Sequence, residues 1–172
     1  MTASATVHLL RHGEVHNPER IVYGRLPEYH LSETGRQMAE LAAAELARRA
    51  ADGARIVWLG ASPLTRAQET AAPVSRELGL PVHTDERLIE AGNWFEGLHV
   101  DRRELAGSPR HWPKLLNPLR PSWGEPYREQ VIRMAEAVKA AAVRAVELGG
   151  DGAEAVLVSH QLPIWTMRSF VE

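Results

Sequence analysis

Arg11 and His12 are the side chains of this chain best suited to chemistry on an anion. They directly follow a short apolar run at residues 6–10, and Gly13 comes next. The run predicts a buried strand, and the glycine allows a tight turn at its end. In open α/β sheets, ligands bind beyond the carboxyl ends of the strands. An arginine there can bind phosphoryl oxygens, and a neutral histidine offers a ring nitrogen as a nucleophile, so this stretch predicts a phosphate site.

Two later apolar runs also lead to basic side chains. Residues 56–59 predict a second buried strand, which runs into a turn and a helix whose first turn carries Arg66. Residues 155–158 predict a third strand, which ends at Ser159 and His160. The ends of parallel strands lie at the same edge of a sheet. We therefore expect two arginines and two histidines to gather around one anion.

An irregular segment at residues 88–98 lies between the second and third strands and carries two carboxylates, Glu90 and Glu96. A carboxylic acid can donate a proton to a leaving group at neutral pH when burial raises its pKa. Burial beside Trp94 and a negative phosphate would have that effect. Both glutamates are therefore candidates for a proton donor.

The segments around these strands carry helical patterns. Ser32 can cap a first helix, residues 65–78 predict a second helix with Pro73 as a kink or restart, and residues 126–148 predict a long third helix. A short strand is expected around Val82. Strands that alternate with helices predict an α/β fold, here a three-layer α/β/α sandwich with a largely parallel central sheet.

Residues 98–128 have no clear periodicity and are rich in proline, tryptophan and arginine. We expect an irregular cap over the site, whose excess of basic residues attracts an anionic substrate. The basic residues are Arg102, Arg103, Arg110, Lys114, Arg120 and Arg128. The alternative is a solvated insertion whose Trp112 and Trp123 pack onto the core. Without an internal repeat or a linker, we expect one catalytic domain over residues 1–172.

The bulk composition is that of a globular enzyme. The chain has 172 residues, 44% hydrophobic and 24% charged, with a formal net charge of −2 and no cysteine. The charge argues against nucleic acid as the main partner, and no apolar run approaches the ~18 residues of a membrane span. A cytoplasmic protein is expected, since nothing resembles a signal peptide and a chain without cysteine suits a reducing compartment. Its oligomeric state stays open.

This set of motifs, in this order, resembles the histidine phosphatase superfamily, the phosphoglycerate-mutase-like enzymes. Residues 10–14, Leu-Arg-His-Gly-Glu, are similar to the nucleophile signature of the family. Residues 62–67, Ser-Pro-Leu-Thr-Arg-Ala, are similar to its second arginine motif, and residues 158–160 to its second histidine motif. Residues 88–98 resemble the segment that holds the proton donor.

The resemblance implies a phosphatase that hydrolyses a small anionic phosphomonoester through a phosphohistidine. It assigns three catalytic residues and three substrate contacts, namely His12, Glu90 and His160, and Arg11, Arg66 and Asn17. Glu90 is favoured over Glu96 as the proton donor. The resemblance implies no metal and no organic cofactor.

The chain departs from the family pattern at several positions. Asn17 lies one position closer to His12 than the phosphate-contacting asparagine of the family usually does. Residues 161–163, Gln-Leu-Pro, follow the second histidine where the family usually has glycine, and residues 124–126, Gly-Glu-Pro, resemble Gly-Glu-Ser with the serine lost. The chain also stops soon after His160. We expect a truncated or partly ordered C-terminus.

Two alternatives to a phosphatase remain. A cofactor-dependent phosphoglycerate mutase shares the chemistry, but the mutases usually have an arginine directly after the catalytic glutamate, where this chain has Ala91 and Gly92. A catalytically silent domain that binds phosphate is suggested by Gln161. The full set of arginines, histidines and Glu90 favours the enzyme.

Overall fold

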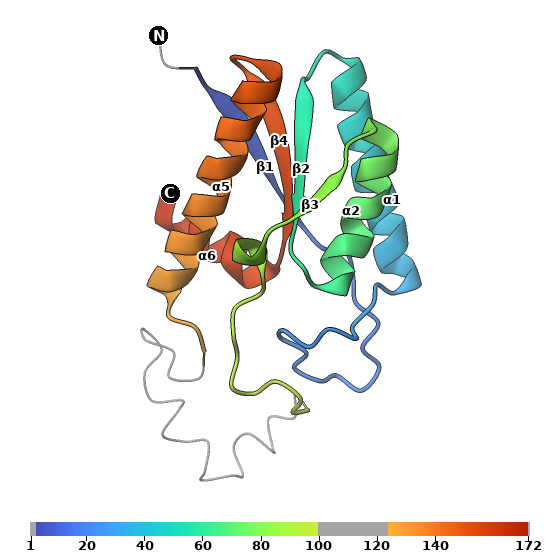
Figure 1. Ribbon diagram of the computed structural model, residues 1–172. Helices are drawn as coiled ribbons and strands as arrows, with labels where there is room; N and C mark the ends of the chain where they lie inside the picture. The colour runs from blue at the N-terminus through green and yellow to red at the C-terminus, as the bar shows by residue number, and fades with distance from the viewer. Residues whose placement is uncertain (1–2, 100–123, 172) are drawn as a thin grey trace.

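A parallel four-stranded sheet forms the centre of the protein (Figure 1). The structure is a computed structural model, and it describes residues 3–99 and 124–171. The strands are β1 (Ala5–Arg11), β2 (Ile56–Ala61), β3 (Val82–Thr84) and β4 (Ala153–Ser159), in the order β1-β4-β2-β3. All three pairings within this sheet are parallel, which confirms the predicted α/β fold.

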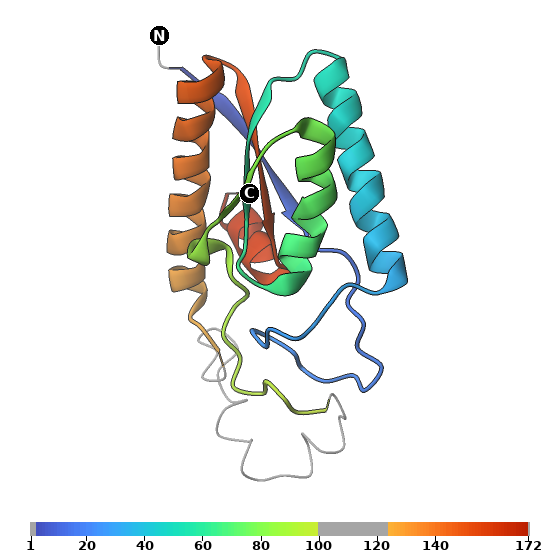
Figure 2. The ribbon, with the colours of Figure 1, turned by 45° about the vertical axis from the view of Figure 1, so that its right-hand side comes forward.

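Helices cover both faces of the sheet and make the three predicted layers. Helices α1 (Glu33–Ala51) and α2 (Thr65–Leu78) lie on one face, and α5 (Tyr127–Gly149) and α6 (Gln161–Val171) lie on the other (Figures 1 and 2). No described helix is long and apolar enough to cross a membrane.

The central strand β4 shows why the sequence forms these layers. Val156 and Val158 pack with the α1 and α2 side of the core, whereas Ala155 and Leu157 pack with the α5 side. Successive side chains of a strand point to opposite faces, so a strand buried on both faces is apolar throughout. This explains the unbroken apolar run from which the strand was predicted.

The helix ends agree closely with the sequence pattern. The Ser32 hydroxyl accepts a hydrogen bond from the Gly35 N–H at 3.0 Å and caps α1 as predicted. Helix α2 continues through Pro73, so the restart predicted there does not occur. Helix α5 begins at Tyr127, so the last two residues of the predicted cap are helical. Residues 100–123 of that cap lie outside the described residues.

The loops of residues 12–32 and 89–99 lie together at the carboxyl end of the sheet (Figure 1). A 3-10 turn, η1 (Glu86–Leu88), leads from β3 into the second of these loops. This is the edge of the sheet at which parallel strands deliver their C-terminal side chains. The predicted site therefore lies between these two loops and the sheet.

Candidate active site

The register of β1 against β4 brings the two predicted histidines together. Arg11 pairs with Ser159, and both are the last residues of their strands. The His12 N–H donates a hydrogen bond to the Ser159 carbonyl at 3.0 Å, so His12 and His160 emerge side by side. Their ring centroids are 5.0 Å apart, and both side chains are buried. Two imidazoles thus share one small space at the end of the sheet.

The tautomer of His12 follows from its backbone contact. Its Nδ1 lies 2.8 Å from the carbonyl oxygen of Gly13, which can only accept a hydrogen bond. Nδ1 therefore carries the proton, and Nε2 keeps a free lone pair. Burial, together with the positive charges of Arg66 and Arg11, lowers the pKa of His12 to about 4. At neutral pH the ring is uncharged and suited to nucleophilic attack.

The ring of His160 is oriented by a residue at the end of β2. Its Nε2 lies 2.7 Å from the Ser62 hydroxyl, which also accepts a bond from the Leu64 N–H at 3.4 Å. Burial, followed by the charge of Arg66, lowers the pKa of His160 to about 2, so the ring is neutral. The Ser62 hydroxyl can donate to Nε2, and in that arrangement the proton of the ring lies on Nδ1. Nδ1 is buried and has no hydrogen-bond partner among the described residues.

Arg66 is held in the site by the loop that follows β1. Its Nη1 and Nη2 donate to the carbonyls of Leu26 and Gly24, at 3.3 and 2.5 Å, and its guanidinium lies 4.8 Å from the centroid of the Tyr23 ring. The side chain is buried in the first turn of α2. Its Nε is buried and unpartnered among residues 3–99 and 124–171. Arg11 supplies a second, exposed guanidinium at the end of β1.

Glu90 has the environment of a proton donor. Burial raises the pKa of Glu90, although the Ala91 N–H, which donates to its Oε1 at 2.8 Å, and nearby arginines act in the opposite direction. Glu90 also borders a cavity of about 310 Å³ that contains Val22, Asn93 and Leu162 in its walls. The other candidate proton donor, Glu96, accepts a hydrogen bond from the Asn93 N–H at 3.1 Å, within its own loop.

The sequence model of the histidine phosphatase superfamily, branch 1, matches residues 7–171. The chain belongs to this superfamily. The match confirms the resemblance that the sequence motifs predicted, and it spans all the strand ends that meet in the site.

Three comparisons illustrate the similarity. The chain is 51% identical over 172 residues to an uncharacterized protein, Rv0525, of Mycobacterium tuberculosis, covering 99% of this chain and 80% of that one. It is similar to the mycobacterial glucosyl-3-phosphoglycerate phosphatase Rv2419c solved with inorganic phosphate, with 26% identity, a TM-score of 0.74, and coverage of 99% and 79%. A phosphoglycerate mutase from Bacillus anthracis shares the fold, with a TM-score of 0.75, 21% identity, and coverage of 99% and 81%.

In this member of the superfamily, the Asn17 amide is engaged within its own loop. Its Nδ2 donates to the Ile21 carbonyl at 2.8 Å, and its Oδ1 accepts from the Ile21 N–H at 3.0 Å. The structure therefore brings together the other five predicted residues and gives Asn17 a role in closing the loop. A contact between Asn17 and phosphate stays a prediction.

Backbone contacts, which the motifs did not predict, fix the turn after His12. The Gly13 N–H donates to the Thr70 hydroxyl at 3.1 Å, which ties this turn to α2. A Cβ atom on Gly13 would lie 2.4 Å from the carbonyl oxygen of Gly35, so only glycine fits. Glycine at this position therefore permits close packing against the start of α1.

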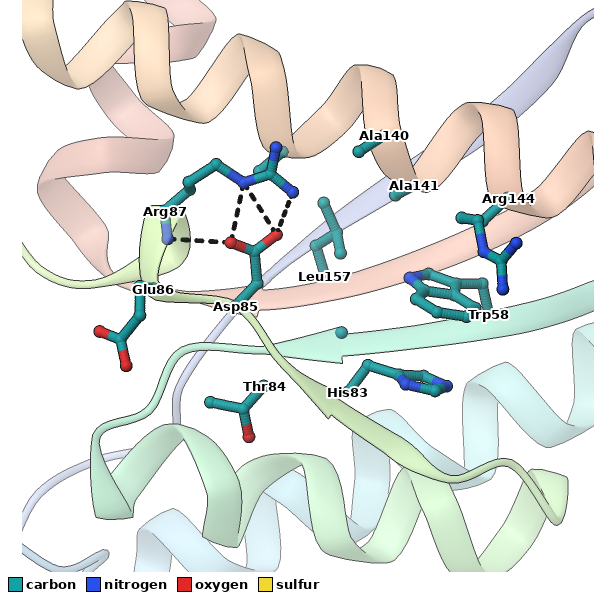
Figure 3. Close-up of a pocket in the computed structure, with 12 residues that line it drawn as sticks. Trp58, His83, Thr84, Asp85, Glu86, Arg87, Ala140, Ala141, Arg144 and Leu157 are labelled. Atoms are coloured by element: carbon teal, nitrogen blue, oxygen red, sulfur yellow. Dashed lines mark hydrogen bonds and ion pairs between the residues drawn. The ribbon is translucent and has the colours of Figure 1, made fainter.

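A second cavity, of about 470 Å³, lies away from these residues, between the β2–β3 end of the sheet and α5 (Figure 3). The rings of Trp58 and His83 stack there with centroids 3.8 Å apart, and Arg87 pairs with Asp85 at 2.7 Å. This cavity contains none of the predicted catalytic or phosphate-binding residues. The candidate active site of this member of the histidine phosphatase superfamily is therefore the one at the strand ends.

Proposed function

We propose that the protein is a phosphatase that hydrolyses a small phosphomonoester through a phosphohistidine at His12. The observation that carries the proposal is a pair of buried nitrogen atoms, Arg66 Nε and His160 Nδ1, without hydrogen-bond partners among the described residues. Buried polar groups are normally hydrogen-bonded. A phosphoryl group beside His12 would accept from both and would be neutralised by Arg66 and Arg11.

The first half-reaction follows from the tautomer of His12. Nε2 attacks the phosphorus, the N–P bond forms and the P–O bond to the alcohol breaks. Glu90 gives its proton to the departing alcohol oxygen, because an unprotonated alcohol oxygen is a poor leaving group. The two guanidinium groups and the His160 N–H stabilise the charge on the phosphoryl oxygens, the main contribution a protein makes to phosphoryl transfer.

The second half-reaction reverses the role of Glu90. Its carboxylate accepts a proton from water as the water oxygen attacks phosphorus. The P–N bond breaks, inorganic phosphate forms, and His12 returns to its neutral state. These steps use neither a metal nor an organic cofactor. The described residues contain no group of three or more acidic or histidine side chains placed to hold a metal ion.

Hydrolysis is favoured over isomerisation by the residue after the proton donor. Ala91 stands where the mutases usually have an arginine, and it contributes its N–H to Glu90. The nearby Arg25 is already paired with Glu125 at 2.9 Å. The similarity at 26% identity to a glucosyl-3-phosphoglycerate phosphatase supports the same choice.

We further propose that residues 1–172 act as one catalytic domain in the cytoplasm, with residues 98–128 covering the site. Two backbone bridges support the position of the cap, since Ile21 pairs with His99 and Asn93 pairs with Gly124. His99 and Gly124, which flank the segment 100–123, therefore lie beside the loops that hold the candidate site. The substrate would be a small anionic phosphate ester.

The experiment is to trap the intermediate by rapid acid-free quenching after addition of p-nitrophenyl phosphate. The wild-type protein should carry acid-labile phosphate, and His12→Asn should carry none, while His16→Asn, an exposed histidine of the next loop, should behave as wild type. Phosphate bound without any phosphoenzyme or product would favour the silent binding domain. Conversion of 3-phosphoglycerate to 2-phosphoglycerate with little free phosphate would favour the mutase.

A further inference from the structure

Glu125, two residues before α5, lies between two arginines. Arg133 donates from Nε and Nη2 to its two carboxylate oxygens, at 2.7 and 2.9 Å, and Arg25 donates from Nη2 to Oε2 at 2.9 Å. The Glu125 and Arg133 side chains are largely buried, and Arg25 is partly exposed. A two-pronged contact between guanidinium and carboxylate fixes orientation as well as distance.

The same two arginines hold the segment that carries the proton donor. Arg25 donates from Nε to the Glu90 carbonyl at 2.7 Å, and Arg133 donates from Nη1 to the Arg87 carbonyl at 2.6 Å. The Glu125 N–H donates to the Gly92 carbonyl at 3.0 Å. The backbone on both sides of Glu90 is therefore attached to Glu125, directly or through one arginine.

Close packing leaves this attachment little freedom. A Cβ atom on Gly124 would lie 2.7 Å from the Gly92 carbonyl oxygen, and one on Gly92 would lie 3.6 Å from Cζ of Arg25. The backbones of Gly124 and Gly92 are thus in close contact, and the Arg25 guanidinium lies beside Gly92 at an ordinary packing distance.

The arrangement also sets the charge that Glu90 experiences. Positive charges near Glu90 come from Arg66 on α2, Arg133 on α5 and Arg11 at the end of β1, while His12 and His160 are neutral. Each positive charge favours the carboxylate over the acid. Glu125 pairs with Arg133, one of these three arginines, and so offsets part of this positive charge. It also pairs with Arg25, whose guanidinium donates to the Glu90 carbonyl.

We propose that Glu125 is a positioning residue for the proton donor, holding the Glu90 backbone through Arg25 and Arg133 and offsetting their charge so that Glu90 stays protonated before turnover. The inference rests on the proposed function, because it needs Glu90 to act as an acid.

The test compares kcat/KM against pH for an alkyl phosphate, whose release needs the proton of Glu90, in four proteins. The alkaline limb of the profile reports loss of that proton. Glu125→Gln leaves two uncompensated guanidinium groups, so the limb should move to lower pH by about half a unit or more. Arg25→Met removes one positive charge, so the limb should move to higher pH. Glu129→Gln, which changes an exposed glutamate in the first turn of α5, should match wild type.

A purely structural role would lower kcat/KM at every pH and leave the limb in place, and that result in both Glu125→Gln and Arg25→Met would overturn the inference. A shift in the same direction in both variants would do so as well. If thermal unfolding shows that Glu125→Gln does not fold, the direction of the shift of the alkaline limb in Arg25→Met decides whether the inference holds. Absence of phosphoenzyme in the wild-type protein would instead remove the proposed function itself.

Discussion

The Nε2 atom of His160 lies 2.7 Å from the Ser62 hydroxyl, although 98 residues separate them in the chain. The hydroxyl comes from the turn that connects β2 to α2, and the imidazole follows β4. Because β2 and β4 are neighbours in the sheet, the two turns meet. A serine in the second arginine motif therefore occupies Nε2 of the second histidine and leaves Nδ1 for a ligand under the proposed function.

Replacing Ser62 by alanine should release this constraint. Ser62→Ala is expected to lower kcat/KM by about tenfold, the cost of about one hydrogen bond, and to weaken inhibition by inorganic phosphate to a similar degree. Nitrogen-15 spectra of the His160 ring should show a change in the proportion of its two tautomers. Ser75→Ala, at the far end of α2, is the matched control. An unchanged tautomer with reduced activity would contradict the assignment.

Glu90→Gln should affect substrates according to their leaving groups. An alkyl alcohol needs the proton of Glu90, so its release should slow by roughly a hundredfold or more. A p-nitrophenolate departs without help, so the burst of phosphoenzyme formation from the aryl ester should be much less affected. Rapid-mixing measurements of the burst for both esters provide the comparison. An equal loss for both would point to Glu96 or to a structural role for Glu90.

The two buried histidines should make stability depend on pH. Their pKa values are about 4 and about 2 in the folded protein, against 6.5 when unfolded, so the unfolded chain binds more protons as the pH falls below 6.5. Folding should therefore lose about 2 kcal/mol per histidine between pH 7.5 and pH 5. Urea unfolding at several pH values measures this slope. His12→Asn and His160→Asn should each flatten it, and the exposed-site variant His16→Asn should not.

Activity should be independent of divalent metal ions. The phosphate site already contains two guanidinium groups and two imidazoles, so the charge that a magnesium ion would supply is provided by the protein. Dialysis against EDTA should leave the turnover of p-nitrophenyl phosphate unchanged, and vanadate, which can adopt five-coordinate geometry, should inhibit. Loss of activity on dialysis followed by recovery with a divalent ion would require a metal-dependent mechanism.

Gly35 should resist the substitution that helices usually favour. An alanine inside a helix is commonly more stable than glycine, by up to about 1 kcal/mol. At Gly35, however, a Cβ atom would lie 2.0 Å from the Glu14 carbonyl oxygen and would clash with it. Gly35→Ala should therefore destabilise the protein by about 2 kcal/mol or more, as overpacking does. Gln37→Ala, exposed on the same helix, should stay within about 0.5 kcal/mol of wild type in denaturant unfolding.

The parts of the site that could be predicted are those fixed by strand ends. Buried apolar runs are followed by Arg11 and His12 and by His160. A third apolar run leads into the helix whose first turn carries Arg66. Local pattern and parallel strand pairing therefore suffice to place these side chains together. Loop contacts carry no such signal. Arg25 and Glu125 are 100 residues apart, and their pairing depends on how two loops approach in three dimensions.

Asn17 illustrates the same limit. The family resemblance implied a phosphate contact for Asn17, which stays a prediction, and the structure adds two hydrogen bonds from its amide to a residue four positions later. Asparagine side chains readily bind nearby backbone groups in turns. Short-range competition of this kind is decided by loop geometry, which spacing alone does not determine.

His99 pairs with Ile21, and Gly124 pairs with Asn93, so the residues that flank the segment 100–123 lie on loops. The proposed anion-binding groups instead lie at strand ends and in the first turn of α2. Insertion, deletion or exchange within that segment would leave the strand ends and the first turn of α2 unaltered. Under the proposed function, relatives of this chain can therefore differ in that segment while they keep the same groups at the strand ends.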